Sequence, residues 1–244
     1  MNKSIQKLNR DQIKLIAIVC MTCNHIAHIL MTPGSVLYEA LEDIGHFTAI
    51  TMCFFLVEGY FYTRSRKNYA KRLFVFALLS EIPFVLAFGY AQLNVIFTLL
   101  ICFAILCVMD SALDTWKKNI CITGLVLLTL FCDCALFLAI AAILFRKSDR
   151  DPQKLAKAYT IVVGLFWLLS IPGYAPADAL YPLLSGYAIL HGFYSAAGLL
   201  VSGVVVLLLY NGKKSERHPK FHKWLFYLYY PAHLLLLWFI SLHL

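Results

Sequence analysis

Charged residues are scarce in this sequence. Asp, Glu, Lys and Arg together make up 14% of the 244 residues, whereas 61% are hydrophobic. The mean hydropathy is +0.75, which is more apolar than the core of a soluble protein of this length requires. The composition therefore excludes a soluble globular protein, and it predicts an integral membrane protein.

Linkers are missing as well, because the chain has no Gly/Ser-rich stretch, tandem repeat or low-complexity tail. We therefore expect one domain over residues 1–244. Apolar segments of roughly the 17–25 residues that a membrane helix needs recur along the whole chain. They lie near residues 13–31, 44–62, 73–90, 94–109, 120–145, 159–172, 192–210 and 224–242. This pattern predicts an all-α fold, a polytopic transmembrane helical bundle surrounded by lipid.

The start of the chain lacks one feature of a cleaved signal peptide. A basic stretch precedes an apolar one, but no small-residue cleavage site follows, and the apolar run contains His25 and His28. We therefore expect the first helix to be retained.

Basic residues are confined to a few connections. By the positive-inside rule these clusters are cytoplasmic, and the acidic connection around Glu39, Glu42 and Asp43 lies outside. The clusters are Lys3/Lys7/Arg10/Lys14, Arg64/Arg66/Lys67/Lys71/Arg72, Arg146/Lys147/Arg150/Lys154/Lys157 and Lys213/Lys214/Arg217/Lys220/Lys223. We expect a cytoplasmic N-terminus, a multi-pass protein of the plasma (bacterial inner) membrane, and no nucleic-acid partner. The oligomeric state is left open.

The segment 120–145 breaks the simple count of crossings, because basic residues flank it on both sides. A polar interruption at Cys132-Asp133-Cys134 suggests two half-helices that dip into the membrane and return. Residues 173–190 are expected to form an outer loop or a partly inserted segment. About nine crossings result, with eight or ten as alternatives.

The eight cysteines all fall in apolar stretches. Disulfide frameworks belong to exposed oxidising loops, so these cysteines are expected to be small buried hydrophobic residues. Cys20 and Cys23 have the spacing of half a metal site, but no second pair accompanies them. We expect no metal.

The first helix carries the strongest functional signal. Lys14, Met21, His25 and His28 share one stripe of that helix. An ionisable side chain in hydrocarbon is costly and marks a functional site by default. His25 is either a catalytic base or a packed histidine bonded to a backbone carbonyl. His28 either contacts other residues of the site or lines an outer vestibule.

Three more ionisable residues lie within apolar runs. Glu58 is either braced by Arg64 or Arg72 or part of the site. Glu81, two residues before a proline, either orients a histidine or forms a structural pair. His233, in the last segment, is expected to face His25, supply an oxyanion donor, or pack.

Further candidates are polar or basic residues at helix ends. Asn94 and Thr98, one turn apart, either hold helices together or line a tunnel. Lys14, Arg64 and Arg72 are candidate phosphate ligands because Arg binds phosphate bidentately, or they only set the topology.

Several motifs together resemble the TraX family of membrane acetyltransferases. They comprise Asp11-x-x-Lys14-x-x-Ala17 with Asn24-His25, the block 44–84, residues 93–98, and residues 226–234, which contain Tyr229-Tyr230-Pro231-Ala232-His233. The first helix is also similar to that of the acyltransferase-three family. Asn24 stands where the TraX pattern usually has Asp, and His46 where it often has Arg. An amide at Asn24 holds no charge against His25 but is able to fix the imidazole tautomer.

This resemblance implies acetyl-CoA as donor and an amine or hydroxyl acceptor, such as the N-terminus of pilin, a glycan or a secreted peptide. Acyl transfer needs a base, oxyanion donors and cations for the CoA phosphates. Imidazole suits the first task. His25 lies about 17 Å from Lys14 by helical rise, which is comparable to the reach of a pantetheine arm.

Two other classes of function fit part of the pattern. Buried His, Glu and Arg also suit a small proton-coupled transporter, but such proteins often contain inverted repeats, and none is evident here. A passive assembly partner for pili or cell-wall machinery leaves the intramembrane charges unexplained.

Overall fold

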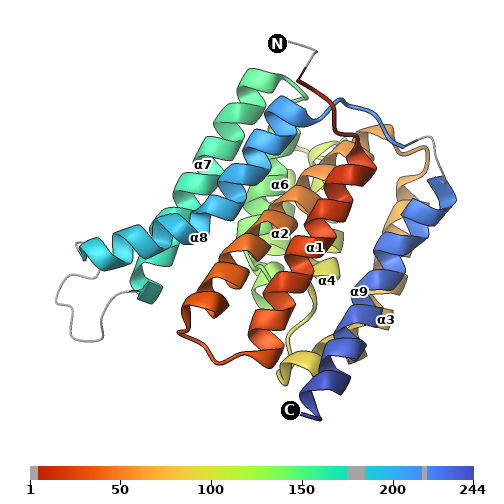
Figure 1. The fold of residues 1–244 in the computed structure, drawn as a ribbon. Helices are drawn as coiled ribbons and strands as arrows, with labels where there is room; N and C mark the ends of the chain where they lie inside the picture. The colour runs from red at the N-terminus through yellow and green to blue at the C-terminus, as the bar shows by residue number, and fades with distance from the viewer. Residues whose placement is uncertain (1–4, 175–184, 216–218) are drawn as a thin grey trace.

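The chain forms a helical bundle in the computed structural model, which describes residues 5–174, 185–215 and 219–244 (Figure 1). Among these residues no strand forms, and the β-type pairing consists of two isolated bridges, Leu8 with Tyr210 and Leu93 with Cys132. The helices are α1 (Arg10–Leu30), α2 (Val36–Tyr62), α3 (Arg66–Phe88), α4 (Val95–Met109), α5 (Thr115–Leu128), α6 (Phe137–Lys147), α7 (Pro152–Ser170), α8 (Gly186–Val204) and α9 (Pro219–Ser241). Short helical turns extend three of them, namely η1 (Thr129–Phe131), η2 (Ile171–Tyr174) and η4 (Val205–Leu209).

Several of these helices are suited to a bilayer. By length and composition, five segments of the described chain are able to cross a membrane: Arg10–Leu30, Val36–Tyr62, Pro152–Tyr174, Gly186–Leu209 and Trp224–Ser241. Helix α4 is apolar but shorter, with 15 residues. The protein is therefore a multi-pass membrane protein of the all-α class.

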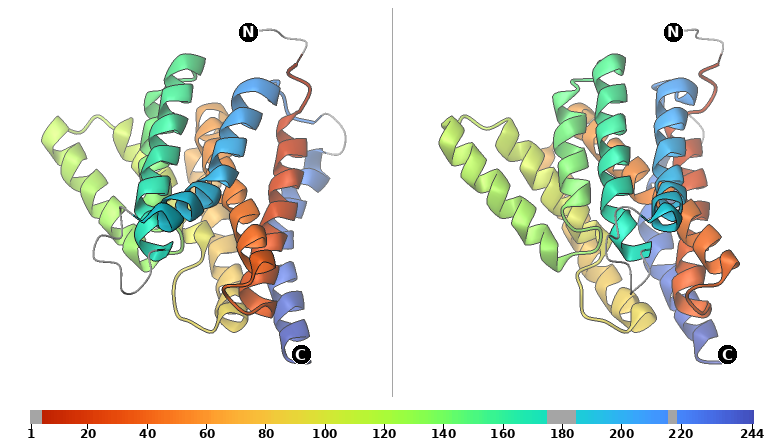
Figure 2. Two further views of the ribbon diagram at one scale, coloured as in Figure 1. Left: turned by 60° about the vertical axis from the view of Figure 1, so that its left-hand side comes forward. Right: turned by 90° about the vertical axis from the view of Figure 1, so that its left-hand side faces the viewer.

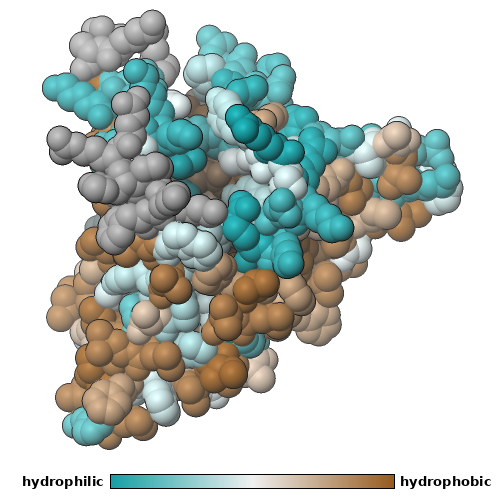
Figure 3. Space-filling view, turned by 90° about the vertical axis from the view of Figure 1, so that its right-hand side faces the viewer, coloured by the Kyte–Doolittle hydropathy of each residue, from teal (hydrophilic) through white to brown (hydrophobic). Residues whose placement is uncertain are grey.

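The helices run alternately in opposite directions, so that the N-terminus and the C-terminus lie at opposite ends of the bundle (Figures 1 and 2). The basic connections lie at the end near the N-terminus, which we call the basic end. The α1–α2 connection and the acidic first turns of α2 lie at the other end, the acidic end. Figure 3 shows polar surface gathered at the basic end and hydrophobic surface below it. Arg217 of the fourth cluster, residues 175–184 of the expected outer loop, and the side chains of Lys220 and Lys223 lie outside the described residues.

The expected half-helices correspond to α5 and α6. They run antiparallel, so that the chain leaves the basic end in α5 and returns to it in α6 (Figure 2). The turn between them is fixed by the segment before α4. Leu93 N donates to Phe131 O over 3.1 Å, and Asp133 N donates to Leu93 O over 2.8 Å. Two turn residues adopt left-handed backbone angles, with φ 54° at Cys134 and 56° at Leu136.

The N-terminal segment is joined to the end of α8. Leu8 N donates to Leu209 O over 3.0 Å, and Asn211 N donates to Leu8 O over 2.9 Å. Asn9 then begins α1 with a capping box that it forms with Gln12. This pairing fixes where α1 starts at the basic end.

Helices α2 and α8 pack closely and are joined by a hydrogen bond between side chains. The hydroxyl groups of Thr51 and Ser202 are 2.7 Å apart. At Gly198 a side chain would have no room, because an added Cβ would lie 2.4 Å from Asp43 O and 2.9 Å from Phe47 N. Small residues and shared hydroxyl bonds are common where membrane helices touch.

Candidate active site

A cavity of about 890 Å³ lies between α1, α2, α3, α4 and α9. Arg10 and Lys14 line it near the basic end, while His25 and His28 line it farther along α1. Arg10 and His28 are eighteen positions apart in the sequence, which corresponds to about 27 Å of helix. The cavity therefore joins the basic end of the bundle to a region near the acidic end.

His25 and His233 form a hydrogen-bonded pair across α1 and α9. His25 Nδ1 lies 2.7 Å from His233 Nε2, and His233 Nδ1 lies 2.8 Å from the backbone oxygen of Tyr229. The two side chains are buried, and their rings lie nearly parallel, at 6°. His25 lines the cavity, whereas His233 is not part of the cavity wall.

The hydrogen-bond pattern assigns the protons of a neutral pair. A carbonyl oxygen only accepts, so His233 Nδ1 carries a proton and donates it to Tyr229 O. His233 Nε2 is then an acceptor, and His25 Nδ1 donates to it. This assignment leaves Nε2 of His25 without a proton, which is the state that a general base requires.

Tyr230 lines the same part of the cavity. Its ring packs edge-on to His25, with ring centroids 6.1 Å apart. The residue is 5% exposed, and its hydroxyl has no hydrogen-bond partner among the described residues. A buried hydroxyl without a hydrogen bond lowers the stability of the fold by about 1–3 kcal/mol, so a hydrogen-bond acceptor placed beside it would be stabilising.

His28 and Asn24 line the far part of the cavity, toward the acidic end. His28 Nδ1 lies 2.9 Å from the hydroxyl of Tyr38, and His28 Nε2 lies 3.5 Å from Glu42 Oε1. Asn24 donates from Nδ2 to the backbone oxygen of Glu42 over 3.2 Å. The tautomer of His25 is thus fixed by His233, since the amide of Asn24 is engaged with α2.

Glu81, Asn94 and Thr98 do not line the cavity directly. Glu81 Oε2 accepts from Asn94 N over 3.1 Å and from Asn94 Nδ2 over 2.7 Å. Thr98 donates its hydroxyl proton to the backbone oxygen of Asp133. These three residues hold the start of α4 and the α5–α6 turn, and Asp133 and Cys134 of that turn do line the cavity.

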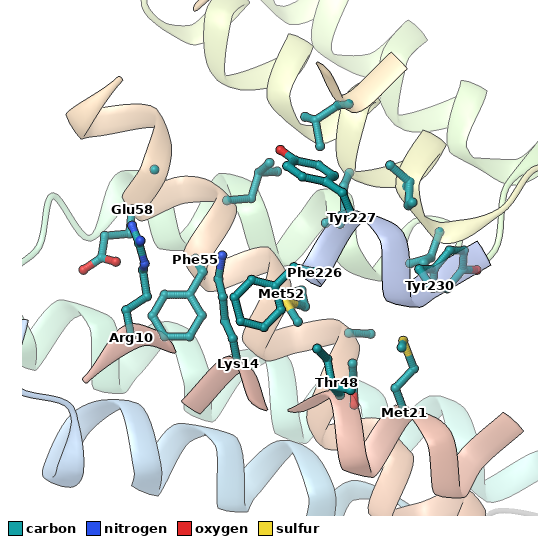
Figure 4. Close-up of a pocket in the computed structure, with 18 of the residues that line it drawn as sticks. Arg10, Lys14, Met21, Thr48, Met52, Phe55, Glu58, Phe226, Tyr227 and Tyr230 are labelled. Atoms are coloured by element: carbon teal, nitrogen blue, oxygen red, sulfur yellow. The ribbon is translucent and has the colours of Figure 1, made fainter. Parts of the chain in front are cut away.

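The end of the cavity near Lys14 is lined by ionisable and aromatic residues (Figure 4). Lys14 Nζ lies 5.6 Å from the ring centroid of Phe55 and 5.1 Å from that of Phe226. Glu58 accepts the hydroxyl proton of Tyr210 over 2.6 Å. Burial and the bond to Glu58 raise the pKa of the Tyr210 hydroxyl above its usual range.

Glu58 is surrounded by cations other than the two arginines that were expected to brace it. The cations whose charges act on Glu58 are Arg10, Lys14 and Arg150, in place of Arg64 or Arg72.

Arg72 and Arg64 lie in different surroundings. Arg72 lines the cavity with its guanidinium 5.2 Å from the ring centroid of Tyr69, and its Nε has no hydrogen-bond partner among the described residues. Arg64 is exposed and is not part of the cavity wall.

The sequence did not single out several residues of the cavity wall. Arg10, Tyr210 and Asp133 line it without having been candidates, and Tyr230 was noted only as part of a motif. The available signal for Tyr230 was its position three residues before His233. His46 also lines the cavity, and its Nδ1 donates to the backbone oxygen of Ser195 over 3.0 Å.

Comparison with known proteins decides the family. The family model described as "TraX protein" matches residues 9–241. The chain belongs to the TraX family. It is 29% identical over 238 residues, covering 93% of both chains, to a protein of Dichelobacter nodosus named "Probable fimbrial assembly protein FimC, serogroup H1". No solved structure matches the chain.

Metal ligands are absent from the part of this TraX-family chain that the structure describes. No group of three or more His, Cys, Asp or Glu residues there is able to hold a metal ion. All eight cysteines are free thiols, and Cys20 and Cys23 are partly buried on α1.

Proposed function

We propose that this TraX-family protein is a membrane-embedded acetyltransferase that uses acetyl-CoA. It moves the acetyl group to an amine or hydroxyl of an acceptor that arrives from the acidic end. The observation that carries the proposal is the chain of hydrogen bonds from Tyr229 O through His233 to His25, which leaves a basic nitrogen on the residue that lines the cavity. The fimbrial relative favours a pilin N-terminus as acceptor, with a glycan or a secreted peptide as alternatives.

The reaction needs one proton to move from the acceptor. Nε2 of His25 takes it as the acceptor nitrogen or oxygen attacks the thioester carbonyl carbon. The new C–N or C–O bond forms, the C–S bond breaks, and the CoA thiolate recovers the proton from the imidazolium. His233 stabilises that imidazolium by accepting a hydrogen bond from Nδ1 throughout.

The donor is oriented by charge. CoA carries several phosphate charges, which do not enter hydrocarbon without cations to meet them. Arg10, Lys14 and Arg72 line the cavity and supply that charge on the cytoplasmic side, while exposed Arg64 lies outside the wall. The rise of about 17 Å from Lys14 to His25 lets the pantetheine arm carry the acetyl group to the base.

The test is the release of free thiol from acetyl-CoA by the purified protein, and Arg72→Gln is the informative variant. The wild type is expected to release thiol only when an acceptor is present. Arg72→Gln should raise the KM for acetyl-CoA and leave that for the acceptor nearly unchanged, because a contact kept from ground state to transition state acts on KM. Lys67→Gln, which removes the same charge outside the cavity wall, is the matched control.

Two outcomes of this assay count against the proposal. If Arg72→Gln and Lys67→Gln have the same KM for acetyl-CoA, Arg72 is not part of the donor site. The second outcome is a wild-type protein that releases no thiol with any amine or hydroxyl acceptor but acidifies proteoliposomes in response to a solute gradient. That result would favour the alternative function, a proton-coupled transporter.

We further propose about nine crossings in the plasma membrane, counting the half-helices α5 and α6 as one each, with the basic end in the cytoplasm. Cysteines placed at exposed Lys67, Lys147 and Lys214 should then resist an impermeant thiol reagent in intact cells, whereas a cysteine at exposed Thr32 should react. Labelling is compared with the parent protein, which has its own eight cysteines. Reaction at Lys147 but not at Lys67 would show that 120–145 crosses once, and the half-helix proposal would fail.

A further inference from the structure

The hydroxyl of Tyr230 differs from that of other buried tyrosines in the bundle. Tyr60 donates to Leu106 O over 3.1 Å and to Asp110 Oδ2 over 2.9 Å, and Tyr159 lies 3.4 Å from the hydroxyl of Ser202. Tyr230 is as deeply buried, at 5% exposure, yet its hydroxyl has no partner among the described residues. A buried donor without a partner is rare in folded proteins and calls for an explanation.

The ring of Tyr230 is held in place by its neighbours. It packs edge-on to His25, at 6.1 Å between centroids, and to His233, at 5.7 Å. In Figure 4 the Tyr230 side chain points away from Lys14 and Glu58. The ring is therefore held beside His25 and is directed away from the cations assigned to CoA.

His233 is not free to serve as a donor for the developing oxyanion. Its Nδ1 donates to Tyr229 O, and its Nε2 is paired with His25. His233 is also not part of the cavity wall, whereas His25 is. Acyl transfer nevertheless requires a donor aimed at the carbonyl oxygen, because negative charge develops there in the transition state.

We infer that the Tyr230 hydroxyl is this donor, so that Tyr230 is a catalytic residue beside His25. The inference rests on the proposed function. When the acceptor attacks, the carbonyl oxygen of the thioester gains the electron pair of the C=O π bond, and Tyr230 O–H donates a hydrogen bond to it. As the C–S bond breaks, the carbonyl reforms and the hydroxyl keeps its proton, so Tyr230 needs no proton source of its own.

The test is Tyr230→Phe, which removes one oxygen atom and keeps the ring packed against both histidines. Removing one oxyanion donor typically lowers kcat by about 10²–10³-fold, and we expect that loss with KM values nearly unchanged. The thermal stability of the variant should equal or exceed that of the wild type, because the lost hydroxyl bonds no described residue.

Tyr60→Phe is the matched control, because it deletes a tyrosine hydroxyl that is bonded and lies outside the cavity wall. It is expected to lower thermal stability and leave the kcat of folded protein within about twofold of the wild type. A Tyr230→Phe kcat within threefold of the wild type overturns the inference. So does a higher KM for the acceptor at unchanged kcat, which would make Tyr230 an acceptor-binding residue.

Two further measurements separate this inference from the proposed function. The pH profile of kcat should keep its shape in Tyr230→Phe, because the base that sets it is His25. If the wild type transfers acetyl groups, His25→Gln does not, and Tyr230→Phe does, only the role of Tyr230 is refuted. A wild type that never consumes acetyl-CoA refutes both.

Discussion

Replacing His25 with glutamine is expected to lower acetyl transfer by about 10²–10⁴-fold, the usual cost of losing a general base. In the wild type His25 Nδ1 lies 2.7 Å from His233 Nε2. Glutamine is chosen because its amide is still able to donate a hydrogen bond to that nitrogen. The variant should therefore insert and fold normally while it lacks a group that accepts the proton. The measurement is thiol release from acetyl-CoA per mole of folded protein.

The matched control for this prediction is His191→Gln. His191 lies on α8, 3.4 Å from Glu39, and is not part of the cavity wall. Its substitution should leave the rate within about twofold, because the side chain lies outside the cavity wall. Near-normal turnover by His25→Gln would end the assignment of the base, whatever the other variants do.

A methyl group added at Gly198 is expected to have the largest effect on stability. The new Cβ would meet two backbone atoms of α2, Asp43 O at 2.4 Å and Phe47 N at 2.9 Å. Backbone atoms do not rotate aside, so α2 and α8 must separate and the bond between Thr51 and Ser202 must lengthen. We expect Gly198→Ala to lower the free energy of unfolding by about 1–3 kcal/mol or more.

Gly164→Ala in α7 is the control, because no atom lies within 4 Å of its added Cβ. Alanine is the better helix former there by up to about 1 kcal/mol, so the control should be neutral or slightly stabilising. Thermal unfolding in one detergent, with the fraction of monodisperse protein, compares the two. Equal unfolding temperatures for both variants would show that the contact between α2 and α8 is looser than described.

The sequence predicted the helices well where apolar runs define them, and less well where polar residues extend them. Helix α2 begins at Val36 rather than near residue 44, because Ser35 caps it and its first turns carry Glu39, Glu42 and Asp43 at the acidic end. Hydropathy alone gives no signal for these polar first turns of the helix. The break in 120–145 was predictable because a carboxylate at Asp133 is hard to place inside a continuous membrane helix.

The candidate site was predictable along α1 but not across helices. A stripe containing Lys14 and His25 follows from helical periodicity alone. The pairing of Glu81 with Asn94 depends on the turn before α4, and the position of Arg10 in the cavity wall depends on where α1 starts. The unpaired hydroxyl of Tyr230 depends on the surrounding helices and leaves no trace in the sequence.

The separation of His25 and His233 along the chain has a consequence for biogenesis. The two residues are 208 positions apart, on the first and last helices, and each completes the other's hydrogen bonding. During synthesis the ribosome must finish α9 before His25 gains the hydrogen bond that fixes its tautomer. A nascent chain that still lacks α9 therefore lacks the hydrogen-bonded histidine pair, which forms only after the last helix has been inserted.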